Sequence, residues 1–221
     1  MKRDRSLDVL IPPLELAGTL TLPEKARGLV AFAHGSGSSR FSTRNIAVAQ
    51  GLNARGFATL LFDLLTPQEE QDRSNVFNVA MLGQRLVGTV DWLQGLEPAV
   101  ASLPVGLFGA STGAAAALIA AAQLPHRIAA VVSRGGRPDL AGEALPHVRA
   151  PTLLIVGGAD LGVIELNKEA LSWLGGPSAL EIIPNATHLF PEPGAMNAVI
   201  EHAGRWFGRH LQAPTSVRAA S

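Results

Sequence analysis

The sequence predicts a single α/β domain in which helices cover both faces of a mainly parallel sheet. Short runs of apolar, mostly branched residues alternate with longer helical stretches along most of the chain, which is typical of parallel strands joined by right-handed crossovers. Near-continuous apolarity within the short runs indicates strands that are covered on both faces. Because 221 residues suit one compact domain, we expect a three-layer α/β sandwich over residues 1–221.

The order of the expected elements follows the same pattern. Residues 7–11 and 14–20 read as extended segments joined at Pro12-Pro13, which favours an antiparallel edge at the start of the sheet. Further strands are expected at residues 28–33, 58–63, 105–108, 128–133, 152–156 and 179–183. Helices are expected at residues 44–55, 77–96, 112–123, 161–174 and 195–210. We expect residues 1–6 and 212–221 to be flexible ends.

The composition excludes several classes of function. With 18 basic and 18 acidic residues the formal charge is +0, so the chain lacks the basic footprint of a nucleic-acid-binding protein. It has no cysteine, which excludes disulfides, thiolate metal sites and a cysteine nucleophile. No apolar run is long enough to span a bilayer, and the start of the chain does not read as a signal peptide. We expect a cytoplasmic protein with no membrane or nucleic-acid partner, no cofactor and no metal; a homodimer is compatible with the sequence.

The strongest local signal is a glycine-flanked serine between a strand and a helix. Residues 105–114 (VGLFGASTGA) run from an apolar segment through Gly109, Ser111 and Gly113 into an alanine-rich helix. This is the context that the Gly-x-Ser-x-Gly nucleophile elbow requires, because the glycines let neighbouring backbone approach a strained turn. The same residues also suit an ordinary turn in which Ser111 only caps the helix. The strand-turn-helix context favours Ser111 as a nucleophile.

An acid and a histidine follow this serine in the order that α/β hydrolases use. Asp160 comes directly after the strand expected at residues 152–156, and His188 lies in the loop after the last strand. Such loops meet at the carboxyl edge of a parallel sheet, where ligands bind. Asp160 could instead cap the next helix, and His188 could be a surface histidine. The other histidines fit the order or the expected loops less well: His34, His126, His147, His202 and His210.

A small-residue loop follows the strand expected at residues 28–33. Its sequence, HGSGSSR over residues 34–40, leaves backbone N–H groups that can face a developing negative charge. We expect an oxyanion hole made by the N–H groups of Thr112 and Ser36, with Gly37 as the second choice for Ser36. His34 and Gly37 are also candidate substrate contacts. A phosphate-binding loop is the alternative, but neither Gly-x-Gly-x-x-Gly nor the P-loop pattern is present.

Four segments of the chain together resemble the dienelactone-hydrolase-like α/β hydrolases. They are residues 34–40 (HGSGSSR), 109–113 (GASTG), 133–140 (SRGGRPDL) and 188–190 (HLF), and the likeness covers nearly the whole chain. The resemblance implies an α/β-hydrolase sandwich without a cap domain and an activity on small esters or lactones. The enzymes that give the family its name use a cysteine nucleophile, whereas this chain has Ser111 and no cysteine. Simple esters are therefore the expected substrates, cleaved through a Ser111, His188 and Asp160 triad and an acyl-enzyme.

The surroundings of the expected site carry less specific signals. Arg134 and Arg137 follow a strand and could bind a substrate carboxylate, although surface salt bridges are the common fate of such arginines. The acidic residues 68–73 could flank the pocket or simply be solvated. The short spacing between Ser133 and Thr152 leaves little room for a lipase-type lid. An acyltransferase with the same triad and a hydrolase-fold protein that only binds a ligand are the rival interpretations.

Overall fold

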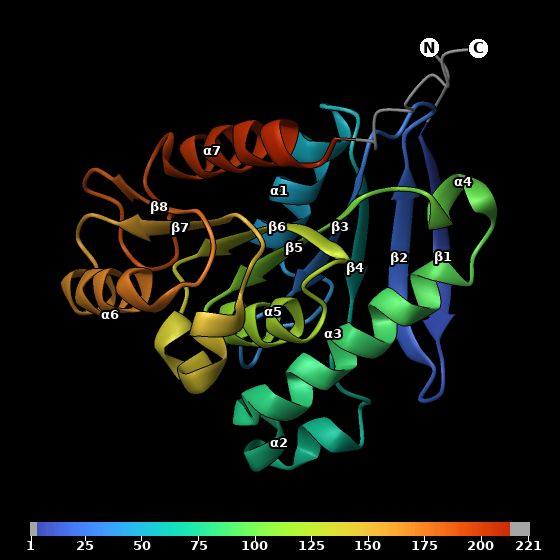
Figure 1. The fold of residues 1–221 in the computed structure, drawn as a ribbon, viewed down its shortest axis with the longest axis horizontal. Helices are drawn as coiled ribbons and strands as arrows, with labels where there is room; N and C mark the ends of the chain where they lie inside the picture. Colours follow the sequence, from blue (N-terminus) through green and yellow to red (C-terminus); the bar gives the residue numbers. More distant parts are fainter. Residues whose placement is uncertain (1–3, 213–221) are drawn as a thin grey trace, which may run out of the picture.

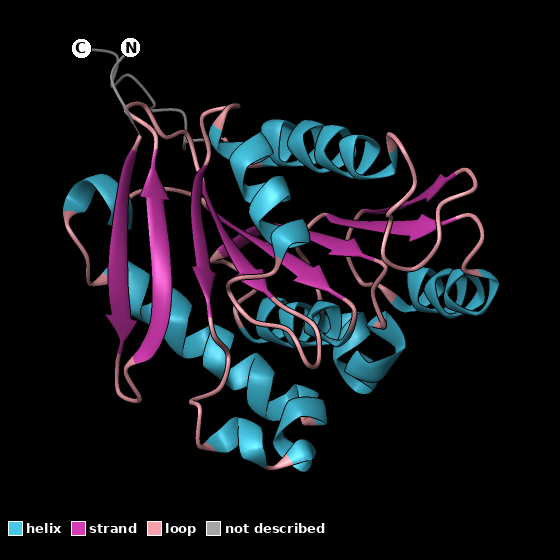
Figure 2. Ribbon diagram, turned by 180° about the vertical axis from the view of Figure 1, so that it is seen from behind, coloured by secondary structure: helices cyan, strands magenta, loops and turns pink. Residues whose placement is uncertain are grey.

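The computed structural model describes residues 4–212, and one eight-stranded sheet runs through the middle of the molecule (Figures 1 and 2). The strand order across the sheet is β1-β2-β4-β3-β5-β6-β7-β8. The strands are β1 (Arg5–Ile11), β2 (Leu16–Leu22), β3 (Leu29–Ala33), β4 (Ala58–Phe62), β5 (Val105–Ala110), β6 (Ile128–Arg134), β7 (Thr152–Gly157) and β8 (Ser178–Ile183). Every strand predicted from the sequence is present.

Helices cover both faces of this sheet (Figure 1). The longer ones are α1 (Thr43–Asn53), α3 (Val79–Gln94), α5 (Thr112–Gln123), α6 (Leu161–Trp173) and α7 (Ala195–His210). Helices α1 and α7 lie together on one face, while α3, α5 and α6 lie on the other. The short segments are α2 (Arg73–Phe77), α4 (Pro98–Ala101) and two 3₁₀ helices, η1 (Glu69–Gln71) and η2 (Pro138–His147). The predicted three-layer α/β-hydrolase sandwich is confirmed.

The sheet is antiparallel only at its first edge. Strand β2 pairs antiparallel with both β1 and β4, whereas all pairs from β4 to β8 are parallel. The prediction of a flexible start is wrong for Arg5 and Ser6, which pair with Leu22 and Thr21. Both residues are exposed, so hydrophobic patterning could not reveal their pairing. Residues 1–3 and 213–221, which were also predicted to be flexible, lie outside the described residues.

The continuous apolar runs are explained by two cores, one on each side of the sheet. In β3, Leu29 and Ala31 face the core that α3 and α5 share, while Val30 and Phe32 face the core under α1 and α7. Successive side chains of a strand point to opposite faces, so both sets of positions must be apolar when both faces are covered.

Short helical segments lie in two connections where the sequence predicts no helix. The connection between β6 and β7 holds η2, which packs on α5 and α6. The segment between β4 and α3 contains η1 and α2. Such short turns of helix carry too few residues for a 3.6-residue period to be visible. No helix within residues 4–212 combines the length and apolarity that crossing a bilayer requires.

The parallel part of the sheet determines where the chemistry can be. The carboxyl ends of β3, β5, β7 and β8 meet at one edge, and the chain continues there into the loops that contain His34, Ser111, Asp160 and His188. Parallel strands with right-handed crossovers necessarily bring these four loops together.

Candidate active site

Ser111 lies on a strained turn between β5 and α5. Its φ of 51° and ψ of −124° lie outside the regions that a residue with a Cβ normally adopts, at a cost of about 1–3 kcal/mol. Although Ser111 is the N-cap residue of α5, its side chain makes no capping hydrogen bond. The alternative that Ser111 serves only as a helix cap is therefore not supported, and the strain indicates that the surrounding structure holds the residue in place.

Close backbone contacts explain the glycines around this turn. A Cβ on Gly109 would lie 2.4 Å from the Cα of Ala114, and one on Gly113 would lie 2.3 Å from the carbonyl oxygen of Ala33. A Cβ on Gly35, across the pocket, would lie 2.9 Å from the Cβ of Ser111. A side chain at Gly113 or Gly35 would push the elbow away from the end of β3 and the loop after it, and one at Gly109 would push β5 away from the start of α5. Small residues therefore recur in both segments.

The end of β6 and the loop that follows it hold the elbow from the other side. The N–H of Ser111 donates to the carbonyl oxygen of Arg134 at 3.3 Å, and the N–H of Arg137 donates to the carbonyl oxygen of Ser111 at 3.0 Å. The nucleophile candidate is thus held by backbone bonds rather than by side chains.

Asp160 and His188 form a hydrogen-bonded pair. The Nδ1 atom of His188 lies 2.7 Å from Oδ2 of Asp160. Asp160 is the N-cap residue of α6, but its carboxylate makes no capping bond and binds the imidazole instead. Two backbone bonds align their loops: Ala159 N–H donates to Ala186 O at 2.9 Å, and Gly158 N–H donates to Ile183 O at 2.8 Å.

Ser111 and His188 line the same pocket, a hollow of about 190 Å³. Its walls come from the loop after β3, the first turn of α1, the elbow, the end of β6 and the loop after β8. The structure therefore brings together Ser111, His188 and, through its hydrogen bond, Asp160, which were predicted as a triad from three separate loops.

The loop after β3 contacts the elbow through Ser36. The N–H of Ser36 donates to Oγ1 of Thr112 at 2.9 Å, so the backbone donor predicted for the oxyanion hole already has a partner in this structure. Gly37, the second choice, has a left-handed φ of 67° and lines a neighbouring hollow rather than the pocket of Ser111. A substrate oxyanion would have to compete with Thr112 for the Ser36 N–H.

The side chain of His34 is buried and binds backbone groups on two loops. It is 7% exposed; its Nε2 accepts from the N–H of Leu64 at 3.1 Å, and its Nδ1 lies 3.0 Å from the carbonyl oxygen of Gly35. An accepting Nε2 requires the proton to be on Nδ1, which donates to Gly35. Burial lowers the pKa of His34, in keeping with a neutral ring. Because both ring nitrogens are engaged, the structure does not support the predicted substrate contact of His34.

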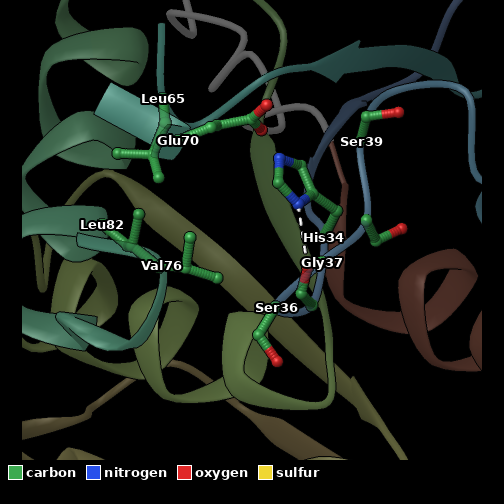
Figure 3. Close-up of a pocket in the computed structure, with 10 residues that line it drawn as sticks. His34, Ser36, Gly37, Ser39, Leu65, Glu70, Val76 and Leu82 are labelled. Atoms are coloured by element: carbon green, nitrogen blue, oxygen red, sulfur yellow. Dashed lines mark hydrogen bonds between the residues drawn. The ribbon is translucent and has the colours of Figure 1, made fainter. Parts of the chain in front are cut away.

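A second hollow of about 310 Å³ lies on the other side of the same loop (Figure 3). Apolar side chains line one part of it, and Glu70 from the acidic segment reaches across it toward the ring of His34. The acidic segment therefore flanks this neighbouring hollow, and none of its residues lines the pocket of Ser111.

The two arginines predicted as substrate contacts have different environments. Arg134 lines the pocket beside Ser111, whereas Arg137 is bound by both carboxylate oxygens of Asp139 and lies outside the residues that line the pocket. Arg137 thus forms a salt bridge, which was predicted from the sequence as the alternative to binding a substrate carboxylate. Sequence reasoning missed Arg44, which also lines the pocket, because an arginine in the first turn of a helix reads as a solvated side chain. Across residues 4–212, no group of three His, Asp or Glu side chains could hold a metal ion.

Comparison with known proteins identifies relatives of two kinds. No family model matches the chain. Two curated proteins of Mycobacterium tuberculosis, from strains CDC 1551 / Oshkosh and ATCC 25618 / H37Rv, are each 57% identical over 212 residues, which is 96% of this chain and 48% of theirs. Both are provisionally named phosphoribosyl transferases. The chain spans about half the length of these relatives.

Solved structures match over the full length. A dienelactone hydrolase from Anabaena variabilis ATCC 29413 is 53% identical, with a TM-score of 0.90 over 95% of this chain and 99% of that protein. Est1E from Butyrivibrio proteoclasticus has a TM-score of 0.76 at 17% identity, covering 92% of this chain and 98% of that protein. Carboxyl esterase 2 from Tuber melanosporum has a TM-score of 0.73 at 17% identity, covering 95% and 88%; these two show the fold alone. On the identity and coverage of the Anabaena enzyme, the chain belongs to the dienelactone hydrolase family of α/β hydrolases.

Proposed function

We propose that this protein is a serine hydrolase that cleaves small carboxylic esters, with lactones in the same range, through an acyl-enzyme on Ser111. The observation that carries the proposal is the 2.7 Å bond between Asp160 and His188, formed beside the pocket that His188 shares with the strained Ser111. Similarity to a dienelactone hydrolase at 53% identity supports the reaction class.

The residues divide the chemistry among them. His188 accepts the proton of the Ser111 hydroxyl on Nε2 while its Nδ1–H donates to Asp160, which orients the ring and stabilises the imidazolium that forms. Ser111 Oγ bonds to the ester carbonyl carbon, the alcohol leaves with the proton from His188, and water then releases the acid by the same steps in reverse order.

Two backbone N–H groups are proposed to stabilise the negative charge on the tetrahedral intermediate. The N–H of Thr112, directly after the nucleophile, is one; the N–H of Ser36 is the other once it turns from Thr112 Oγ1 to the oxyanion. In a characterised serine protease, removal of one such donor costs roughly 3–4 kcal/mol of transition-state stabilisation.

The test combines covalent labelling with turnover. A fluorophosphonate probe should label Ser111, as located by mass spectrometry, and Ser111→Ala should lower hydrolysis of a short-chain 4-nitrophenyl ester about 10⁴-fold or more. Ser172→Ala is the matched control, because Ser172 is exposed on α6 and its hydroxyl binds only the carbonyl oxygen of Glu169. A folded protein that hydrolyses no ester and carries no adduct on Ser111 would remove the proposal.

Two rival activities give different results in the same assay. An acyltransferase also depends on Ser111 but yields a transfer product when an alcohol acceptor is added. Phosphoribosyl transfer, the activity in the names of the Mycobacterium relatives, uses no acyl-enzyme, so it would be unaffected by Ser111→Ala. The chain matches only about half the length of those proteins. The activity in their name could therefore belong to the half that this chain does not match.

A further inference from the structure

The pocket of Ser111 is basic. Arg44 and Arg134 contribute to its lining, and the twelve residues that line it include no aspartate or glutamate. The two arginines therefore have no carboxylate partner within the lining of the pocket that contains the candidate nucleophile.

Arg134 is the more unusual of the two arginines. It is 6% exposed, and its Nε and Nη1 atoms are buried without a hydrogen-bond partner. Burial, together with the charge of Arg44, lowers the pKa of Arg134 to about 10, so the side chain is still protonated at neutral pH. Buried charges in proteins are normally paired, and an unpaired one that lines a pocket indicates a missing anion.

Arg44, the second arginine of the pocket, lies at the start of a helix. Its Nε atom is also buried without a partner, and it lies in the first turn of α1 beside Ser42 and Asn45, which line the pocket too. The N-terminus of a helix carries a partial positive charge and attracts anions. Ser38 and Ser42, whose side chains carry hydroxyl groups that can donate, line the same pocket.

Neighbouring arginines show that pairing is the rule in this region of the chain. Arg40 is bound to Asp63, and Arg137 is bound to Asp139. No carboxylate among the described residues forms such a pair with Arg44 or Arg134, and the interaction that the two share is mutual repulsion.

We propose that the ester cleaved by Ser111 carries a phosphate group, which Arg134 and Arg44 bind at the start of α1. This inference rests on the proposed function for the reaction and adds the class of substrate. A phosphate monoester has close to two negative charges at neutral pH and three acceptor oxygens, which matches two guanidinium groups, whereas one carboxylate would leave one of them uncompensated. The phosphate serves only for binding. Ser111 attacks the carbonyl carbon, and the phosphate ester bond stays intact.

Binding of inorganic phosphate tests the site independently of turnover. At millimolar phosphate and constant ionic strength, the thermal midpoint of the wild-type protein should rise by about 2 °C or more. The rise should disappear in Arg134→Gln and in Arg44→Gln. It should persist in Arg137→Gln, the matched control, because Arg137 lies three residues from Arg134 but outside the pocket lining.

Matched substrates then connect the site to catalysis. The ratio of kcat/KM for 4-acetoxyphenyl phosphate to that for phenyl acetate should fall about tenfold or more in Arg134→Gln and in Arg44→Gln. It should stay at the wild-type value in Arg137→Gln. Comparing ratios removes the difference in intrinsic reactivity between the two leaving groups.

The outcomes separate the two proposals. A phosphate-dependent rise in midpoint that requires both arginines supports the anion site even if no ester is hydrolysed, in which case only the proposed reaction fails. An active esterase whose midpoint does not respond to phosphate, or responds equally in both arginine variants, overturns the anion site. A response to malonate but not to phosphate overturns it in favour of a carboxylate-bearing substrate.

Discussion

The N–H of Ser36 donates to the side-chain oxygen of Thr112 at 2.9 Å, joining two residues that are 76 positions apart in the chain. Thr112 is the first residue of α5 and follows Ser111 directly, while Ser36 is in the loop after β3. One partly buried hydrogen bond thus joins the elbow to the opposite wall of the pocket.

Thr112→Val tests this bond with a side chain of nearly the same shape. The variant leaves the Ser36 N–H without its acceptor, and a lost hydrogen bond of this kind costs about 1 kcal/mol or more. We expect kcat for a short-chain aryl ester to fall about tenfold with little change in KM, because the loop after β3 would no longer be held against the elbow, from which the Ser36 N–H turns to the oxyanion. Steady-state kinetics give both constants.

Thr112→Ser is the matched control, since it keeps the hydroxyl and removes only a methyl group. It should retain most of the wild-type kcat. Equal rates for the wild type and Thr112→Val would mean that the bond has no part in positioning the loop, and a faster valine variant would mean that the hydroxyl only competes for the donor.

Asp160→Asn tests whether His188 needs the carboxylate of Asp160 for catalysis, because the variant keeps the histidine and removes only the charge beside it. The amide is isosteric with the carboxylate but cannot stabilise an imidazolium, and it allows the wrong imidazole tautomer; the corresponding change in a characterised serine protease costs roughly 10⁴-fold in kcat. We expect a loss of about 10³-fold or more in ester turnover with the fold intact by circular dichroism. Asp139→Asn is the control, because Asp139 binds Arg137 outside the pocket lining. A loss of less than tenfold would exclude Asp160 as the acid of the triad.

Gly113→Ala should damage both folding and activity. The new Cβ would lie 2.3 Å from Ala33 O and 2.5 Å from His34 O, and backbone atoms cannot yield as a flexible side chain can. Relief requires movement of α5 away from β3, so we expect a loss of several kcal/mol in the free energy of unfolding, measured by urea denaturation.

Gly88→Ala provides the opposite case within a helix. Gly88 is exposed in α3, and a Cβ there would meet nothing within 4 Å. Alanine in a helix interior is favoured over glycine by about 1 kcal/mol, so this variant should be more stable than the wild type. If both glycine variants shifted stability in the same direction, close backbone approach would not be the reason for Gly113.

His34 should make stability depend on pH below neutrality. Its pKa is lowered by burial from the ordinary 6.5, so below about pH 6.5 the unfolded chain binds more protons at this position than the folded one. The free energy of unfolding should therefore fall as pH decreases from about 7.5 toward the lowered pKa. Urea denaturation at several pH values measures this slope.

His34→Gln removes the titrating ring and should flatten that slope relative to the wild type. The comparison isolates His34 because the other five histidines are unchanged. Parallel curves for the two proteins would show that the protonation of His34 does not differ between the folded and unfolded states.

The positions of the strands and long helices were predictable from the sequence. Helices α5 and α7 have the predicted bounds, and each buried strand was found within a few residues, because burial of both sheet faces imposes a continuous apolar run. The elbow was predictable for a different reason: a strained turn needs small residues on both sides of Ser111, and that requirement is local in the chain.

The α/β architecture and the chain order of Ser111, Asp160 and His188 can therefore be inferred without the folded structure. The pairing of the polar groups becomes visible only in the folded chain. In the structure, Arg137 forms a salt bridge with Asp139, and Nε and Nη1 of Arg134 have no hydrogen-bond partner. The Ser36 N–H donates to Thr112. This difference arises because apolar burial produces a periodic pattern within a single segment, whereas a hydrogen bond or ion pair depends on how segments far apart in the chain are placed against one another.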